Sequence, residues 1–264
     1  MYTSNDGGHE MSTDRFRLDN KIALVTGASR GIGEAIARGI AGMGATVVLA
    51  SRKQETLDAV AQSIAAEGGT AKGIACHTGK LDDIDALYSR IDAEFGRIDI
   101  LVNNAATNPY FGPVVGISES LYDKTFEVNT KGYFFMAQRA AQRMVEQGGG
   151  SILNIASTAG ISPYPMQGVY AMTKAATIMM TKVFAKELAG ANVRCNAICP
   201  GLTETKFARV LIDTPEIYEI FVKNTPMGRH AQPEEIVGAA LYLVSDAASY
   251  TTGAILPCDG GGTI

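Results

Sequence analysis

Two side chains that exchange protons, Tyr170 and Lys174, lie four residues apart in a stretch with helical periodicity. Residues at this spacing share one face of a helix, so the phenol and the amine are expected to lie side by side. A free tyrosine, with a pKa of about 10, is a slow acid–base catalyst at neutral pH, but a neighbouring ammonium favours the phenolate and lowers that pKa. The pair therefore suits proton transfer to or from an oxygen atom, although its spacing alone is weak evidence.

Two further polar residues strengthen this interpretation. Ser157 follows the apolar stretch Ser151–Ala156, and Asn129 lies in the helical stretch that precedes it. The carboxyl ends of strands in a parallel sheet are where such proteins bind ligands. A hydroxyl at such an end can hold a substrate oxygen by a hydrogen bond.

The segment TGASRGIG (Thr26–Gly33) connects an apolar run to a stretch of helical period that begins at Gly31. Gly27 permits a tight turn, Gly31 lets the backbone approach a phosphate, and Gly33 lets the helix pack close to the strand. The first N–H groups of a helix have no partner within it and can donate to an anion. The turn therefore predicts a nucleotide site. Its expected contacts are Gly27, Ser29, Arg30, Ile32 and Gly33.

The residues that follow the second apolar run indicate which dinucleotide binds. A site for NAD usually places a carboxylate there to bind the ribose hydroxyls, about 20 residues beyond the glycine turn. This chain has Ser51 at that position, followed by Arg52, and Arg30 adds a second guanidinium from the turn. A carboxylate would repel a 2′-phosphate, whereas guanidinium groups bind it through charge-assisted hydrogen bonds. The sequence therefore predicts NADP(H).

Strand-like and helix-like segments alternate along the chain, which predicts an α/β protein with a doubly wound Rossmann sheet of seven mostly parallel strands, covered by helices on both faces. The expected strands are Lys21–Thr26, Thr46–Ala50, Thr70–Cys76, Ile98–Asn103, Ser151–Ala156, Asn192–Ile198 and Ala254–Pro257. The expected helices are Gly31–Met43, Gln54–Glu67, Asp82–Phe95, Ser118–Glu146, Gly168–Leu188 and Pro233–Leu243. Residues 1–17 are expected to form a poorly ordered tail, and residues 18–264 a single catalytic domain. Within it, the irregular segment 201–225 is expected to act as a substrate lid.

Composition excludes several other classes of protein. Nearly half of the 264 residues are apolar, and the net charge of −4 is made of dispersed charges of both signs. No basic stripe suggests nucleic-acid binding, and no apolar run approaches the roughly 18 residues that cross a bilayer. The four cysteines lack metal-ligand spacing, so no metal site is expected. These features predict a cytoplasmic protein.

Together the motifs resemble those of the short-chain dehydrogenases/reductases, from Lys21 to the terminal DGGG. The matching segments are TGASRGIG, the NNAA at Asn103–Ala106, the helix with Asn129, Ser157, YAMTK at Tyr170–Lys174, and CPG at Cys199–Gly201. The resemblance implies that Asn129, Ser157, Tyr170 and Lys174 form a catalytic tetrad. Tyr170 would pass the proton, Ser157 would hold the substrate oxygen, and Lys174 would bind the nicotinamide ribose. Asn129 would bind a water that connects Lys174 to solvent.

The resemblance also extends the expected cofactor site. Its further contacts would be Ser51, Arg52, His77, Asn103, Ala105, Tyr170, Lys174, Pro200, Gly201, Leu202 and Thr205. Two positions depart from the common family pattern. Ala106 stands where the last glycine of NNAG is usual, and His77 stands where an aspartate commonly faces the adenine.

Short segments (CHTGK, NPYFG and PGLTET) resemble a narrower group of the family, the NADP-dependent carbonyl/retinal reductases called dehydrogenase/reductase member four. This favours an apolar carbonyl or alcohol as substrate. The candidate pocket wall is mostly apolar or aromatic: Asn108, Tyr110, Phe111, Ile161, Tyr164, Met166, Phe207, Leu211, Ile217, Tyr218 and Phe221. Residues of these types also form core or subunit contacts, so this alternative stays open for them.

Two alternatives stay open. One is a 3-oxoacyl-thioester reductase that accepts an acyl carrier protein, for which Arg139 and Arg143 on one helix face offer a basic surface. The other is a cofactor-binding scaffold without catalysis, which the presence of Tyr170 and Lys174 disfavours. The family resemblance further implies a homotetramer, with the helices 118–146 and 168–188 pairing across a two-fold axis.

Overall fold

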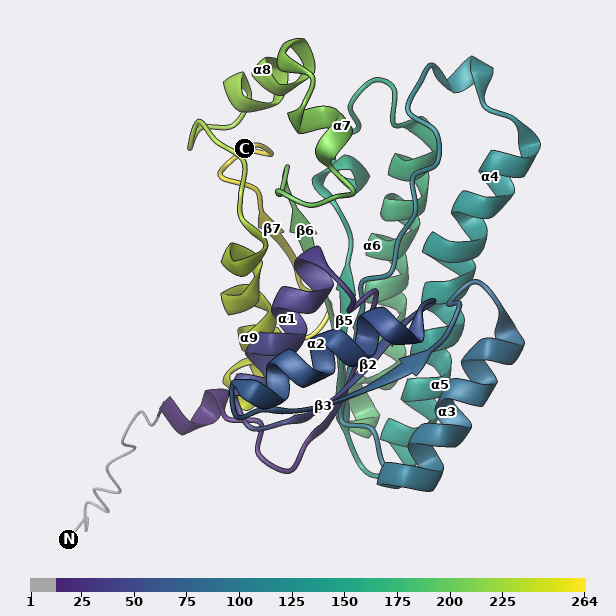
Figure 1. The fold of residues 1–264 in the computed structure, drawn as a ribbon, viewed down its shortest axis with the longest axis vertical. Helices are drawn as coiled ribbons and strands as arrows, with labels where there is room; N and C mark the ends of the chain where they lie inside the picture. The colour runs from purple at the N-terminus through teal and green to yellow at the C-terminus, as the bar shows by residue number, and fades with distance from the viewer. Residues whose placement is uncertain (1–12) are drawn as a thin grey trace, which may run out of the picture.

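The computed structural model describes residues 13–264 as a seven-stranded parallel sheet in the order β3-β2-β1-β4-β5-β6-β7, with helices on both faces (Figure 1). The strands are β1 Ile22–Thr26, β2 Thr46–Ser51, β3 Thr70–Ala75, β4 Ile100–Asn103, β5 Gly150–Ile155, β6 Val193–Pro200 and β7 Ile255–Cys258. The main helices are α1 Gly31–Gly42, α2 Gln54–Ala66, α3 Leu81–Phe95, α4 Glu119–Phe126, α5 Tyr133–Glu146, α6 Gly168–Leu188 and α9 Val237–Val244. The predicted doubly wound Rossmann sheet is therefore confirmed, and each predicted strand is present within two residues at either end.

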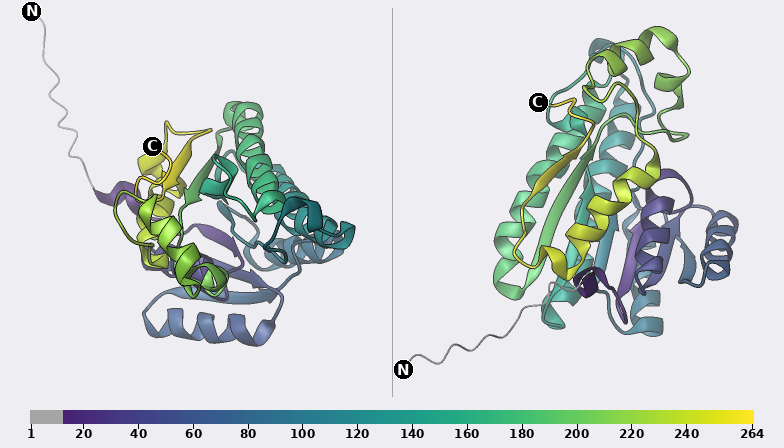
Figure 2. Two further views of the ribbon diagram at one scale, coloured as in Figure 1. Left: turned by 90° about the horizontal axis from the view of Figure 1, so that it is seen from above. Right: turned by 90° about the vertical axis from the view of Figure 1, so that its left-hand side faces the viewer.

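The two faces of the sheet are buried by different helices, as the views in Figure 2 make visible. Alternate residues of β1 and β2 contribute to opposite cores, because successive side chains of a strand point to opposite faces. Val25 packs with residues of α1, α2 and α9, whereas Leu24 packs with residues of α3, α5 and α6. Burial on both sides explains why these strands are continuous apolar runs.

The strand order reverses between β1 and β4, which lie side by side at the centre of the sheet with Val25 opposite Val102. An open α/β sheet binds its ligand outside the carboxyl ends of the strands at such a reversal. The glycine turn follows β1, and Asn104 follows β4, so both lie at this point. The Asn104 backbone N–H donates to Thr26 Oγ1 at 2.9 Å, and this bond ties the two strand ends together.

The helix predicted over 118–146 is interrupted. A π-helical turn, Glu127–Gly132, separates α4 from α5. The turn brings Gly132 so close to the Thr78 carbonyl that no side chain would fit there, and it buries Asn129 completely. Wider π turns of this kind often occur at functional sites. The apolar periodicity of the sequence continues through residues 127–132. The sequence pattern therefore does not indicate that the helix is interrupted there.

The segment 201–225 is not irregular, contrary to the prediction. It contains two short helices, α7 Arg209–Ile212 and α8 Pro215–Lys223, which lie over the carboxyl ends of the strands (Figure 1). Proline at the first position of α8 pre-sets the backbone for a helix and lacks only an N–H that would have no partner there. A Tyr218–His230 hydrogen bond of 2.9 Å holds α8 to the chain that follows it.

The expected tail, residues 1–17, extends too far along the chain. Residues 1–12 lie outside the described part, but Thr13–Phe16 form a short 3₁₀ helix. The Arg15 guanidinium donates to Ser249 Oγ at 2.9 Å and to the Asp246 carbonyl at 3.1 Å, which fixes this helix against the domain. Between residues 13 and 264, no helix has the length and apolar character needed to cross a membrane.

Candidate active site

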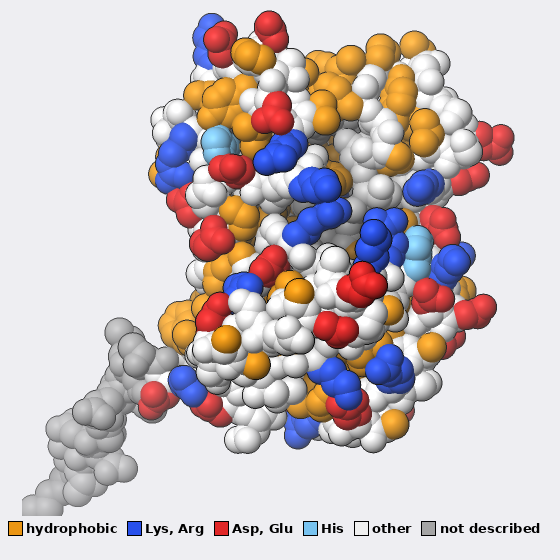
Figure 3. All heavy atoms as spheres, in the orientation of Figure 1, with side chains coloured by type: hydrophobic (Ala, Val, Ile, Leu, Met, Phe, Trp, Pro, Cys, Tyr) orange, Lys and Arg blue, Asp and Glu red, His pale blue; other side chains and the backbone are white. Residues whose placement is uncertain are grey.

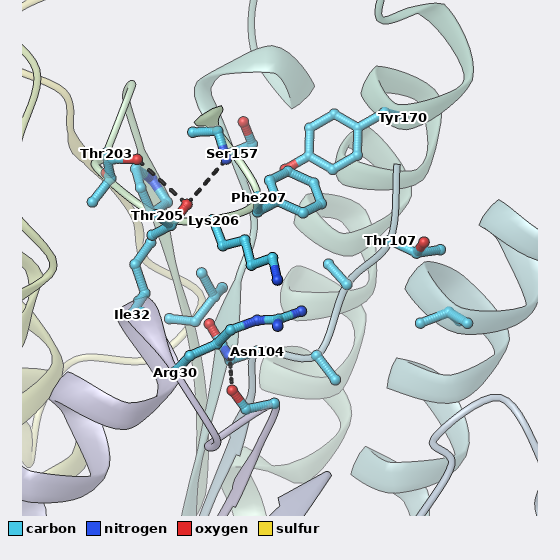
Figure 4. A pocket seen from close by; sticks show the side chains of 18 of the residues that line it. Arg30, Ile32, Asn104, Thr107, Ser157, Tyr170, Thr203, Thr205, Lys206 and Phe207 are labelled. Carbon is cyan, nitrogen blue, oxygen red and sulfur yellow. Dashed lines mark hydrogen bonds between the residues drawn. The ribbon is translucent and has the colours of Figure 1, made fainter. Parts of the chain in front are cut away.

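Three of the four predicted tetrad residues line one cavity, and two of them come from the same helix. Tyr170 and Lys174 lie one turn apart on α6, and Ser157 lies just beyond the end of β5. Figure 4 shows the side chains of Ser157 and Tyr170 directed into the same space. The loop after Ser157 can approach α6 closely because residue 160 is glycine, where a Cβ would lie 2.6 Å from the Lys174 carbonyl carbon.

Burial has a larger effect than neighbouring charge on the pKa values of Tyr170 and Lys174. It raises the pKa of Tyr170 to about 12, against a smaller opposing effect of a hydrogen bond with Ser157. It also lowers the pKa of Lys174 to about 7, because the charged ammonium loses its hydration. The expectation that Lys174 and a bound oxidised nicotinamide together favour the phenolate stays a prediction, because burial acts in the opposite direction in the chain by itself. The sequence places the amine near the phenol but does not reveal that the amine is buried and the phenol half-buried.

This buried lysine makes a testable contribution to stability. The pKa of Lys174 is about 7 when folded, against its ordinary value of 10.5, so between these values the unfolded chain binds a proton that the folded chain does not. The unfolding free energy should therefore rise with pH above about 7, by up to about 1.4 kcal/mol per pH unit from this group. Chemical denaturation of the protein and of Lys174→Met between pH 7 and 9 measures it. The variant should lose this slope, and an unchanged slope would contradict the assignment.

Asn129, the fourth predicted residue, lies beside the cavity but does not line it. Its Oδ1 accepts from the Thr107 N–H at 2.8 Å, and its Nδ2 donates to the Thr107 carbonyl at 2.8 Å and to Thr173 Oγ1 at 3.2 Å. The side chain thereby ties the loop after β4 to α6. Its expected role in holding a water near Lys174 stays a prediction.

The glycine turn has the close approaches that the sequence predicts. A Cβ at Gly33 would lie 2.5 Å from the Gly27 carbonyl oxygen, so helix α1 can start against the turn only with glycine there. A Cβ at Gly31 would meet the methyl group of Thr205 at 3.0 Å. The first turn of α1 receives no side-chain cap from Arg30, which leaves its N–H groups available to an anion.

Gly33→Ala is expected to destabilise the protein by about 1–3 kcal/mol, because the added methyl group forces backbone apart. Gly42→Ala, in the same helix, is a matched control: its Cβ would meet nothing within 4 Å. Alanine should leave stability unchanged or raise it there. Thermal unfolding of the two variants compares them directly, and equal melting temperatures would show that the turn tolerates a side chain.

The cavity has a volume of about 450 Å³ and opens at the carboxyl ends of the strands. Cationic side chains gather around the hollow (Figure 3). Those that line it are Arg30, Arg52, Lys53, Lys124, Lys174 and Lys206. Among the described residues, no carboxylate lines the cavity, so an anion entering it would meet no negatively charged side chain.

Most of the predicted cofactor residues line this cavity. They are Gly27, Ser29, Arg30, Ile32, Ser51, Arg52, His77, Ala105, Tyr170, Lys174, Pro200, Gly201, Leu202 and Thr205. Gly33 lies behind the turn, where it serves packing. His77 Nδ1 accepts a hydrogen bond from the Gly79 N–H at 3.2 Å, so in the neutral ring Nε2 is the donor.

Asn103 lies outside the cavity, contrary to the prediction. Its side chain is buried beneath the sheet end, where Nδ2 donates to the Tyr133 carbonyl and to Asn154 Oδ1, both at 3.1 Å. Asn104, the next residue, lines the cavity instead. Because side chains alternate along a strand, a shift of one residue exchanges the buried and the open position.

Only part of the expected substrate wall faces the cavity: Tyr164, Phe207, Leu211 and Phe221. The Phe207 ring lies 5.7 Å from that of Tyr170, and Phe221 of α8 lies 4.6 Å from Tyr164 on the opposite side. The other predicted wall residues lie outside it: Asn108, Tyr110, Phe111, Ile161, Met166, Ile217 and Tyr218.

Sequence reasoning missed several polar residues of the cavity, among them Lys124, Gln167 and Lys206. Lys206 comes from the segment before α7, and Figure 4 shows its amine beside the Arg30 guanidinium. The position of Lys206 directly after the predicted contact Thr205 was the available signal. Lys124 and Gln167 stand in no recognisable motif.

Comparisons with known proteins agree with this site. A family model described as enoyl-(acyl carrier protein) reductase matches residues 27–263. Dehydrogenase/reductase SDR family member 4 of Bos taurus is 41% identical over 244 residues, which are 92% of this chain and 88% of that protein. D-threitol dehydrogenase of Mycolicibacterium smegmatis is 40% identical over 256 residues, 97% and 98% of the two chains.

A solved structure has the same fold. The gluconate 5-dehydrogenase of Burkholderia cenocepacia, in complex with NADP and tartrate, aligns with a TM-score of 0.91 and 36% identity. The alignment covers 95% of this chain and 98% of the other. With matches of this extent in sequence and structure, the chain belongs to the short-chain dehydrogenase/reductase family of oxidoreductases.

Proposed function

We propose that the protein transfers a hydride between NADP(H) and a carbonyl or alcohol substrate, with Tyr170 as the general acid and base. The observation that carries this proposal is the single cavity shared by Ser157, Tyr170, Lys174 and the glycine turn. The dinucleotide, when bound, supplies the hydride chemistry, and the protein supplies position and field.

The side chains of the cavity bind the substrate and transfer the proton. Ser157 holds the substrate oxygen by a hydrogen bond, and Tyr170 gives that oxygen a proton during reduction or accepts one during oxidation. Lys174 carries its charge into the cavity, where it stabilises the phenolate and can bind a ribose hydroxyl. A bound cationic nicotinamide adds positive charge near Tyr170, which favours the phenolate against the effect of burial.

The preference for NADP(H) rests on charge. Arg52 and Ser51 stand where a carboxylate would select NAD, and no described carboxylate lines the cavity. Arg30 lines the same cavity and supplies the second guanidinium for the 2′-phosphate, and the Lys206 amine points toward this guanidinium (Figure 4). Relatives with NADP in their structures support the same choice.

For the substrate we propose an apolar ketone or aldehyde, or the corresponding alcohol. Phe207, Leu211, Phe221 and Tyr164 offer apolar surface around Tyr170, as such a substrate requires. A polyhydroxy alcohol or sugar acid is the second candidate. The polar side chains of Lys124 and Gln167 favour it, as do the names D-threitol dehydrogenase and gluconate 5-dehydrogenase among the relatives.

A screen separates these substrates. Ketones, aldehydes, polyols, sugar acids and acyl thioesters are assayed with each dinucleotide by following the absorbance of the reduced nicotinamide. Highest kcat/KM for an apolar carbonyl with NADPH would support the leading proposal. Turnover of none of these compounds with either dinucleotide would contradict catalysis and leave the scaffold alternative.

The carrier-protein alternative is disfavoured by ion pairs. Arg139 and Arg143 on α5 are neutralised by Asp85 and Asp92 of α3, at 2.8 and 2.5 Å. These arginines therefore do not form the free basic surface that an acidic carrier would need.

The segment 201–225 is proposed to act as the lid, because Phe207, Leu211 and Phe221 reach from it into the cavity. A homotetramer is proposed for the assembly, since α5 and α6 leave Phe134, Met172, Met179 and Val183 partly exposed. Light scattering measures the mass of the assembly. A cytoplasmic location stays a prediction of the sequence.

A further inference from the structure

A second buried tyrosine lies beneath the catalytic pair. Tyr133 is the first residue of α5, directly after the π-helical turn, and only 1% of its surface is exposed. In the sequence it stands in an apolar helix face and is typical of a core residue. Its ring and its hydroxyl group both face the amine of Lys174, however, and not only other apolar side chains.

The contacts form a small hydrogen-bonded triangle. Lys174 Nζ donates to the Ile155 carbonyl at 2.7 Å and to the Tyr133 hydroxyl oxygen at 3.4 Å. The Tyr133 hydroxyl in turn donates to the same carbonyl at 3.1 Å. The amine also lies 5.0 Å from the centre of the Tyr133 ring, within the range of a cation–π interaction.

The direction of these bonds decides what Tyr133 can do. A phenol has one proton, and Tyr133 gives it to Ile155, so its oxygen presents lone pairs to the amine. Both the oxygen and the face of the ring then attract a positive charge. Burial raises the pKa of Tyr133, which keeps the phenol neutral and acts against its serving as a proton carrier.

Few other groups can stabilise the positive charge of a protonated Lys174. Its neighbours from the surrounding elements are Tyr170 on α6, Cys199 on β6, Ile155 at the end of β5, and Tyr133 on α5. Among the described residues, no carboxylate forms an ion pair with it. An ammonium in this position depends on neutral dipoles and ring faces.

We propose that Tyr133 is a positioning residue that keeps Lys174 charged and directed at the catalytic tyrosine. This inference rests on the proposed function, because it assigns Tyr133 a task only through Lys174. It also gives a reason for the π-helical turn, which immediately precedes Tyr133 and starts α5 beside the amine of Lys174.

The test uses Tyr133→Phe, with Tyr88→Phe as matched control. Tyr88 is also fully buried and donates its hydroxyl to a backbone carbonyl, that of Met136 at 2.6 Å, but it lies between α3 and α5 and does not line the cavity. Both variants lose the bond from the hydroxyl to a backbone carbonyl, and Tyr133→Phe also loses the 3.4 Å bond from Lys174 Nζ. Loss of the carbonyl bond alone would therefore affect the two proteins alike, whereas only Tyr133→Phe removes a contact to Lys174.

The first readout is the titration of Lys174 by NMR in protein carrying ¹³C-labelled lysine, with the signal assigned by its loss in Lys174→Met. Tyr133→Phe should lower this pKa by about half a unit or more, because the charged form loses an acceptor. Tyr88→Phe should leave it unchanged. An unshifted Lys174 titration in folded Tyr133→Phe would overturn the proposal.

The second readout is the pH profile of kcat/KM for alcohol oxidation. The acid limb should move to higher pH in Tyr133→Phe, since the phenolate of Tyr170 loses part of its positive neighbour, while the dissociation constant for NADPH changes less than about twofold. A profile equal to that of Tyr88→Phe would overturn the proposal. Failure of the proposed function itself is recognised separately, by full activity of Tyr170→Phe.

Discussion

Tyr170→Phe is expected to lower kcat by about 10²–10⁴-fold, the range over which a positioned acid or base accelerates a reaction. The variant keeps the ring that packs 5.7 Å from Phe207 and loses only the proton that the substrate oxygen needs. Binding of NADPH, measured by its fluorescence on titration, should therefore change less than about twofold. Equal losses in kcat and kcat/KM would place the effect in the transition state.

Tyr164→Phe is the matched control for this experiment. Tyr164 lines the same cavity and contacts Phe221, but the proposal gives it no proton to transfer. We expect it to alter KM more than kcat. Wild-type turnover by Tyr170→Phe would refute the acid–base assignment, whatever the substrate.

Arg52→Ala is expected to weaken NADPH binding by roughly 10- to 100-fold and NADH binding by less than about threefold. A hydrogen bond between charged groups contributes about 1.5–3 kcal/mol, and only NADPH carries the 2′-phosphate that would lose it. Dissociation constants for both cofactors, measured at one fixed salt concentration, give the ratio of the affinities for NADPH and NADH. Lys53→Ala is the control for a neighbouring cation that also lines the cavity.

Ser51→Asp extends the same test, because a carboxylate at this position repels the 2′-phosphate and can bind the free ribose hydroxyl of NADH. The preference should then move toward NADH. If the wild-type protein already binds NADH more tightly than NADPH, the assignment of Ser51 and Arg52 is wrong.

The sequence predicted those parts of the protein whose constraints are local. The turn at Gly27, Gly31 and Gly33 is fixed by backbone approach, and the Tyr170–Lys174 spacing is fixed by helical geometry, so both were correctly placed. The strands were found because burial on both faces makes them continuous apolar runs. The end of β4 at Asn103 was also predicted correctly, but Asn103 was expected in the cavity that its neighbour Asn104 lines.

Features that depend on tertiary contacts could not be predicted from the sequence. The π-helical turn depends on the approach of Gly132 to Thr78, more than 50 positions away in sequence, and nothing in the local pattern marks it. Burial is the main cause of the pKa shifts of Tyr170 and Lys174, and burial cannot be read from their spacing in the sequence. Ion pairing of Arg139 and Arg143 likewise needed the position of α3.

A Cβ at Gly31, the first residue of α1, would lie 3.0 Å from the methyl group of Thr205, so the start of the segment over the cavity packs near the glycine turn. Because Phe207 and Leu211 of the same segment line the cavity, we expect the coenzyme to bind first and depart last. Steady-state kinetics should accordingly follow a compulsory order, with the product coenzyme competitive against the incoming one and the second substrate's product noncompetitive.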